Sequence, residues 1–348
     1  MVEFWYGVVA IMLTLYVVMD GFDLGAGTLH LFVARTNEER REVLAAIGPY
    51  WDGNEVWLLA TGGALFVAFP PVLAAGLSGF YFAIFLVLWC LILRGISIEF
   101  RSHVADPMWR SLWDAGLSIA SGLLALFFGA ALGNLLRGLP IDEQGWFSLT
   151  LFTDFSARAP VGILDWYTVT VGVFAVAALA LHGATFLVWK TGGPVHERSH
   201  RLAARLAVAV SAGWILVTIA TVQVNATFFA GFTTRPAAWA AIAAAAGGLV
   251  AVARGLGVHR PLVPFLGSCA FLAGLLGATA ITIFPDMLHS IGAPAPSITA
   301  YSAANDTTGL WTAFQWWIIG FPLAVLYFVV VFRLHRGKVT APPEGQGY

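Results

Sequence analysis

The chain has 348 residues, of which 59% are hydrophobic and only 11% are charged. Soluble domains carry about 25% charged residues, so this composition excludes a soluble globular protein and favours a polytopic membrane protein. The apolar segments are continuous runs rather than alternating residues, which indicates helices and not a β-barrel. The formal net charge of −1 argues against a polybasic surface, and we expect no nucleic-acid partner.

Nine apolar stretches are long enough to cross a membrane as helices. They cover residues 4–33, 54–75, 79–100, 114–136, 161–189, 204–229, 237–254, 262–284 and 311–333. The sequence therefore predicts an all-α polytopic membrane protein with nine transmembrane helices. We expect a single transmembrane domain over residues 1–336 and a cytoplasmic tail over residues 337–348.

The basic residues alternate with the predicted spans. Fifteen of the 18 Lys and Arg residues lie in or beside the loops after spans one, three, five and seven, or in the C-terminal tail. The other three lie in the loops after spans four and six. By the positive-inside rule, we expect the N terminus outside and the C terminus in the cytoplasm. The alternation also supports the count of nine spans.

The segment TNEERREVLAAIGP (36–49), between the first two spans, predicts a short amphipathic helix on the cytoplasmic face. Thr36 or Asn37 can cap its start, and Gly48-Pro49 ends it. Farther along, HGATFL (182–187) weakly resembles DGFDLG at the end of the first span. This likeness suggests duplication of a four-span unit, and it is equally compatible with chance.

Two carboxylates interrupt the first span. Asp20 and Asp23 are spaced i, i+3, so they share one helix face and should point into protein rather than lipid. Gly21 and Gly25 form a GxxxG pattern that lets a neighbouring helix approach closely. The acids can mark an ion or proton pathway, or they can simply hydrogen-bond to a neighbouring helix and stabilise the bundle.

A second polar group begins the next span in WDGNEVW (51–57). Asp52 and Glu55 are again spaced i, i+3, with Asn54 between them. The flanking tryptophans are typical of a membrane interface, where the acids would be solvated. Alternatively, the Asp-Gly-Asn sequence indicates a bent helix start with polar groups turned inward.

The third span ends with three charged residues, Arg94, Glu99 and Arg101. Arg94 lies deep enough to be the counter-ion of an intramembrane aspartate, and such pairing would lower the cost of burying both. Asp114 opens the fourth span on the same side. The sequence therefore predicts one set of acids and arginines in the cytoplasmic half of the first four spans.

Two histidines lie within apolar spans, and both could in principle ligate haem or a metal. A lone histidine such as His182 is more often hydrogen-bonded than a ligand, and nothing in its spacing from His30 demands ligation. We find no nucleotide-binding, zinc-protease or nucleophile motif. The buried carboxylates are thus the strongest functional signal.

Several segments resemble subunit II of cytochrome bd-type quinol oxidases. They are MDGFDLGAG (19–27), RTNEERR (35–41), PYWDGNEVWLLATGGALFVAFP (49–70), GFYFAIFLVL (79–88) and RGISIEFRS (94–102). The resemblance is most specific in the first hundred residues. It continues more weakly through GNLLRG (133–138) and HGATFL, and span count and loop lengths also agree.

The resemblance implies two four-helix bundles, residues 1–136 and 161–289, and a peripheral ninth helix at 311–336. It also implies a heterodimer with a haem-bearing subunit I in the bacterial cell membrane, with small accessory subunits, lipid and quinone as further partners. That subunit carries haems b558, b595 and d, oxidises quinol and reduces O2 to water with cytoplasmic protons. No haem would be ligated by this chain. The Arg-rich composition favours menaquinol as the donor.

The resemblance also assigns residue roles. An acid of the WDGN motif belongs to a proton path in the family, which corresponds to Asp52 here. Asp20 matches the first acid of the DGFD motif and is expected in or beside the same route, with Asp23 lining it. Glu55 stands where some members have Gln, which weakens a proton role for it. Two alternatives are a secondary transporter with intramembrane carboxylates and a purely structural assembly subunit.

Overall fold

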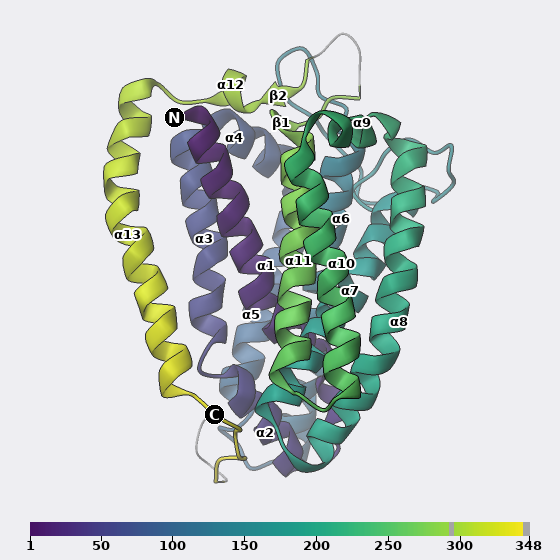
Figure 1. Cartoon of the computed structure of the whole chain (residues 1–348), viewed down its shortest axis with the longest axis vertical. Helices are drawn as coiled ribbons and strands as arrows, with labels where there is room; N and C mark the ends of the chain where they lie inside the picture. The colour runs from purple at the N-terminus through teal and green to yellow at the C-terminus, as the bar shows by residue number, and fades with distance from the viewer. Residues whose placement is uncertain (292–295, 344–348) are drawn as a thin grey trace.

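The computed structural model describes residues 1–291 and 296–343, and most of them lie in helices that run between two ends of the molecule (Figure 1). Eight helices of this described part are long and apolar enough to cross a membrane. They are α1 (Val2–Val33), α5 (Tyr81–Phe100), α6 (Pro107–Arg137), α7 (Trp166–Lys190), α8 (Gly193–Val224), α10 (Pro236–Gly257), α11 (Leu262–Ile283) and α13 (Thr307–Leu334). The all-helical membrane architecture is therefore confirmed.

The second expected span, 54–75, is not one continuous helix. It is divided into α3 (Trp51–Ala68) and α4 (Pro70–Gly79), with Phe69 as a non-helical residue between them. Pro70 explains the break, because proline lacks an N–H group and is favoured in the first turn of a new helix. Because its first turns are polar, the 18-residue α3 is not among the helices that are long and apolar enough to cross a membrane.

The sixth expected span, 204–229, is also placed differently. Helix α8 begins at Gly193, since the polar residues before the apolar run continue the same helix, and it ends at Val224. Asn225 leaves helical geometry, and its side chain accepts a hydrogen bond from the Phe228 N–H. This N-cap starts a separate short helix, α9 (Ala226–Thr234).

The predicted helix after the first span is present as α2 (Asn37–Ile47). Thr36 is its N-cap: its hydroxyl accepts from the Glu39 N–H at 3.2 Å, and the Glu39 carboxylate accepts from the Thr36 N–H at 3.2 Å. These reciprocal bonds satisfy two donors that helix formation leaves unpaired. The capped helix lies at the end of the molecule opposite the N terminus (Figure 1).

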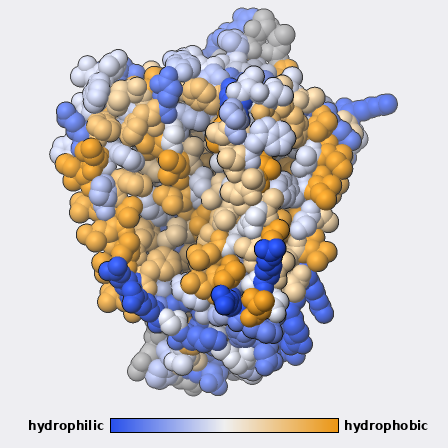
Figure 2. Space-filling view, viewed as in Figure 1, coloured by the Kyte–Doolittle hydropathy of each residue, from blue (hydrophilic) through white to orange (hydrophobic). Residues whose placement is uncertain are grey.

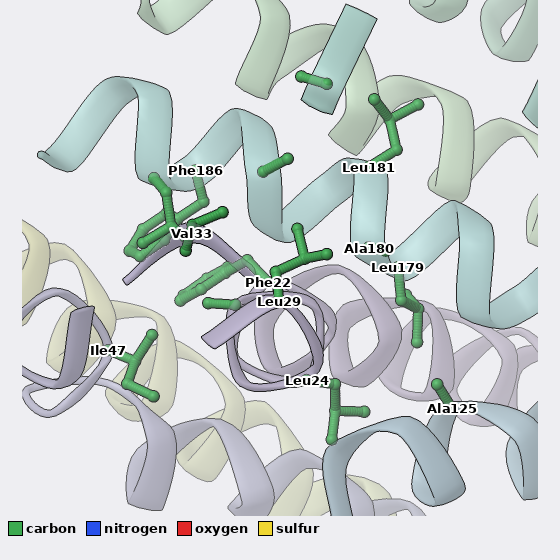
Figure 3. Close-up of a cluster of buried hydrophobic side chains, with 14 of the residues drawn as sticks. Phe22, Leu24, Leu29, Val33, Ile47, Ala125, Leu179, Ala180, Leu181 and Phe186 are labelled. Carbon is green, nitrogen blue, oxygen red and sulfur yellow. The ribbon is translucent and has the colours of Figure 1, made fainter. Parts of the chain in front are cut away.

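Helices α1 and α7 form the centre of the molecule. A Cβ atom on Gly25 would lie 1.9 Å from the Leu179 carbonyl oxygen, and one on Gly183 would lie 2.2 Å from the Ala26 nitrogen. Glycine is therefore required where these backbones cross. Beside the crossing, Phe22 and Phe186 stack with ring centroids 4.1 Å apart (Figure 3).

The other helices are arranged around this pair. Helices α3 and α6 pack on α1, α5 packs on α6, and α8 and α11 pack on α7, with α10 against α11. Helix α13 lies at the edge of the molecule and contacts α3 (Figure 1). Hydrophobic side chains cover the middle of the visible face, and hydrophilic ones gather at its two ends (Figure 2).

The short irregular elements lie at the end of the molecule where the N terminus is found (Figure 1). A short antiparallel pair, β1 (Asp286–Leu288) and β2 (Ile298–Thr299), leads into α12 (Ala300–Ala303). At the opposite end, Val339 of the expected tail donates its N–H to the Lys190 carbonyl at 2.8 Å. Residues 344–348 of that tail lie outside the described part of the chain.

Candidate functional site

Five polar side chains from three helices meet inside the membrane-spanning part, and we call them the acid-rich cluster. They are Asp20 and Asp23 of α1, Asn54 and Glu55 of α3, and Arg94 of α5. Asp20, Asp23, Asn54 and Arg94 are at most 1% exposed. Glu55 is the most open member, since 25% of its side chain is exposed. The cluster thus has a closed interior and one acid near its edge.

Arg94 binds two carboxylates at once. Its Nη1 donates to Asp20 Oδ2 at 2.9 Å, and its Nη2 lies 2.8 Å from Asp20 Oδ1. The same Nη2 also donates to Glu55 Oε1. A planar guanidinium suits such paired contacts. The structure therefore places Asp20, Glu55 and Arg94 in one ion-pair network.

Asp23 is held by a neutral partner instead. The Asn54 Nδ2 group donates to Asp23 Oδ2 at 2.7 Å and to the Met19 carbonyl at 3.1 Å. Asp23 Oδ1 has no hydrogen-bond partner within the described residues. With three carboxylates and one guanidinium, the cluster has more acids than cations. Because uncompensated buried charge is costly, such a group is suited to hold an additional proton.

Asp52 lies outside this buried group. It is exposed in the first turn of α3, one turn before Glu55 on the same helix face. The acids therefore follow one another from the surface inward: Asp52, then the partly exposed Glu55, then Asp20 with Arg94. This order is what a path from the aqueous phase into the protein requires.

A second group, the Asp114 cluster, lies nearer the end that carries α2. Asp114 Oδ1 is 2.6 Å from His30 Nε2 and accepts from Arg101 Nε at 2.5 Å, while Oδ2 accepts from Arg40 Nη1 at 2.8 Å. The carboxylate is completely buried. One acid thus joins α1, α2, α5 and α6 through two arginines and a histidine.

The sequence predicted one set of acids and arginines in the first four spans. In the structure these residues form two separate clusters, so that prediction was wrong. Arg94 lies on α5 and Arg101 is the C-cap residue of that helix, seven residues or about 10 Å farther along, so they bind different acids. Arg101 belongs with Asp114, and Glu99 is exposed. Sequence reasoning missed Arg40. The signal for it was an arginine-rich amphipathic helix with one face turned inward.

The intramembrane histidines are engaged in hydrogen bonds. His182 Nε2 lies 2.8 Å from the Val18 carbonyl and its Nδ1 lies 2.7 Å from Ser268 Oγ. A carbonyl can only accept, so Nε2 carries the proton. Among the residues that the structure describes, no group of three His, Cys, Asp or Glu side chains could hold a metal ion.

Comparison with known proteins identifies the family. Residues 1–335 match the model of the family described as cytochrome bd terminal oxidase subunit II. The chain belongs to this family. It is 31% identical to cytochrome bd-I ubiquinol oxidase subunit 2 of Escherichia coli K12, over 97% of this chain and 94% of that relative.

Other comparisons agree with the assignment to the subunit II family. Cytochrome bd ubiquinol oxidase subunit 2 of Bacillus subtilis is 33% identical over 59% of this chain and 58% of that protein. The fold is similar to a chain in the structure of the bd oxidase from Geobacillus thermodenitrificans, with a TM-score of 0.73, 16% identity, and coverage of 96% and 98% of the two chains.

The motifs that resemble the subunit II family are the segments that the fold brings together. DGFDLG supplies Asp20 and Asp23, WDGNEVW supplies Asn54 and Glu55, and RGISIEF supplies Arg94. These segments are far apart in sequence and meet only because α3 and α5 lie within reach of the same face of α1. The acid-rich cluster is therefore the best candidate for a functional site in this chain.

Proposed function

We propose that this chain is the subunit of a bacterial quinol:O2 oxidoreductase that ligates no haem, supports a haem-bearing subunit I and relays cytoplasmic protons to the oxygen-reduction site. The family match over residues 1–335 supports the oxidase assignment. The partner would carry haems b558, b595 and d and form a heterodimer with this chain in the cell membrane. Small accessory subunits, lipid and quinone are further proposed partners.

We propose nine membrane crossings, with α3 and α4 together as the second. Helices α1, α3, α5 and α6 would form one four-helix bundle, α7, α8, α10 and α11 the other, and α13 the peripheral helix. The N terminus would face outward. The described end of the chain after α13 lies at the opposite end of the molecule, near α2 and the arginines Arg35, Arg40 and Arg41, which supports a cytoplasmic location for the tail.

We propose that protons enter at Asp52 and pass through Glu55 to the Asp20–Arg94 pair, with Asp23 and Asn54 beside it. The observation that carries this proposal is the surplus of buried carboxylates over cations in the acid-rich cluster. Intramembrane carboxylates of this kind commonly belong to proton pathways. Asp52 and Glu55 are three residues apart on α3, so the exposed acid and the partly exposed acid lie on the same face of the helix.

Replacing Asp52 with Asn tests whether protons enter the path at this residue. In the purified two-subunit complex, Asp52→Asn should slow quinol:O2 turnover about tenfold or more and leave the haem absorption bands intact, because a proton-carrying group is lost without a buried contact. Glu197→Gln, which neutralises another exposed acid, is the matched control. Unchanged turnover would contradict the path, and loss of haem bands would give Asp52 a structural role.

We propose menaquinol as the electron donor. Its support is compositional, since an Arg-rich, Lys-poor sequence is typical of GC-rich actinobacterial genomes. Turnover of the purified complex with menaquinol and with ubiquinol analogues tests it. A secondary transporter would instead work without haem, so a co-purified complex without haem bands would favour that alternative over the oxidase.

A further inference from the structure

Tyr16 stands at the inner end of the acid-rich cluster. It precedes Asp20 by four residues on α1, so both side chains lie on the same helix face. The side chain is 2% exposed. The charged side chains that act on its hydroxyl are Asp20, Arg94 and Glu55. Tyr16 was not among the site residues expected from the sequence, because an aromatic residue in a membrane helix usually serves packing alone.

Two polar groups at this point have unused hydrogen-bonding capacity. The Tyr16 hydroxyl has no hydrogen-bond partner of good geometry in the described part of the chain. Asp20 Oδ1 likewise accepts no well-aligned hydrogen bond, although Arg94 Nη2 lies 2.8 Å away. A donor without an acceptor and an acceptor without a donor thus lie one helical turn apart. A buried polar group left unpaired is costly, so their pairing is favoured.

The ring of Tyr16 has apolar neighbours. The Tyr16 ring packs edge-on against Phe128, with centroids 5.5 Å apart. The ring also forms part of the wall of a mainly apolar cavity of about 540 Å³, next to Val17 and Leu24. Its charged neighbours therefore all belong to the acid-rich cluster. With the ring packed, the main remaining freedom of the hydroxyl is rotation about its C–O bond.

We propose that Tyr16 is a positioning residue of the proton relay and pairs with Asp20 in both protonation states of that carboxyl group. A tyrosine hydroxyl can donate and accept. When Asp20 is charged, the hydroxyl donates to Oδ1. When Oδ1 carries a proton, that O–H group donates to the tyrosine oxygen. Asp20 can then gain and lose a proton without leaving a buried polar atom unpaired. This inference rests on the proposed relay.

The test is Tyr16→Phe in the full complex, which removes one oxygen atom and keeps the ring. Quinol:O2 turnover should fall about three- to tenfold with unchanged haem bands. The acid limb of its pH profile should move to higher pH, because the charged carboxylate loses a donor. Asp20 is also faced by Arg94 of α5, Glu55 of α3 and Asp23 of α1, all unchanged in the variant.

Tyr6→Phe is the matched control. Tyr6 lies on the same helix and donates to the Ala280 carbonyl at 2.6 Å, away from the cluster. Its loss should leave the pH profile in place. Asp20→Asn provides the second background, in which Tyr16→Phe should have no additional effect, because Tyr16 acts through Asp20.

The outcomes separate this inference from the proposed function. If Asp20→Asn slows turnover while Tyr16→Phe changes neither rate nor pH profile, the role of Tyr16 is wrong and the relay stands. Full additivity of the two substitutions would also overturn it. If Asp20→Asn, Asp52→Asn and Tyr16→Phe all run at the wild-type rate with intact haem bands, the relay itself is wrong.

Discussion

The two buried polar clusters differ in their balance of charge. The acid-rich cluster has Asp20, Asp23 and Glu55 around one guanidinium, whereas Asp114 is surrounded by Arg40, Arg101 and His30. In the first, the carboxylates cannot all be compensated. In the second, one carboxylate is over-compensated and stays charged. An acid surplus suits proton exchange, and a base surplus suits a fixed structural contact. We therefore expect the two clusters to have different roles, and the variants below test this.

The largest expected effect of a substitution is in the Asp114 cluster. Asp114→Asn removes the charge that compensates Arg40 and Arg101, and breaking a buried ion pair commonly costs about 3–5 kcal/mol. We expect loss of the assembled complex, measured as its thermal stability and haem content after purification. Glu197→Gln, an exposed acid, should change neither. A stable Asp114→Asn complex with impaired turnover would instead give Asp114 a functional role and remove the contrast.

The next largest effect is expected for a substitution in the acid-rich cluster. Asp20→Asn leaves Arg94 paired with Glu55, so the complex should assemble with intact haem bands. Turnover should fall by an order of magnitude or more, because a proton-carrying group is lost. Steady-state oxygen consumption together with an absorption spectrum measures both. Loss of haem comparable to that of Asp114→Asn would show that both clusters are structural.

The smallest effect concerns an ion pair outside both clusters. Burial raises the pKa of Glu39, but hydrogen bonds from Arg198 and from the N–H groups of Arg35 and Thr36 outweigh it and hold the pKa below its ordinary value of 4.5. Arg198 Nη2 lies 2.6 Å from the Glu39 carboxylate and so links α8 to α2. The stability gained is present above pH 4.5 and is lost as the pH falls through the lower pKa of the folded protein.

Glu39→Gln should therefore lower stability near neutral pH by only about 0.5 kcal/mol, because the pair lies near the surface. The difference from the wild type, followed by thermal unfolding at several pH values, should disappear in acid. Glu38→Gln, at the neighbouring exposed position, should show no such pH dependence. A difference that persists in acid would mean that the cap geometry matters and the charge does not.

Much of the fold follows from the sequence because the membrane restricts the choice. Long apolar runs must be helical in lipid, where each backbone polar group needs an internal partner. The helix over Asn37–Ile47 was predictable because its capping residues are local in sequence. The boundaries at Phe69 and Asn225 were not predicted correctly, since hydropathy alone does not show where a proline or a cap interrupts an apolar run.

The sequence alone placed acids and arginines on the same side of the membrane, since span direction and i, i+3 spacing are local properties. It suggested Arg94 as the counter-ion of an intramembrane aspartate but could not say which acid each arginine binds, because each pair joins helices distant in the chain. Only the tertiary structure shows that Arg94 pairs with Asp20 and Glu55, and that Arg101 pairs with Asp114. It also shows that the Tyr16 hydroxyl, one helical turn from Asp20, has no hydrogen-bond partner among the described residues. The close crossing of α1 and α7 at Gly25 and Gly183 fixes the helix face on which these partners meet.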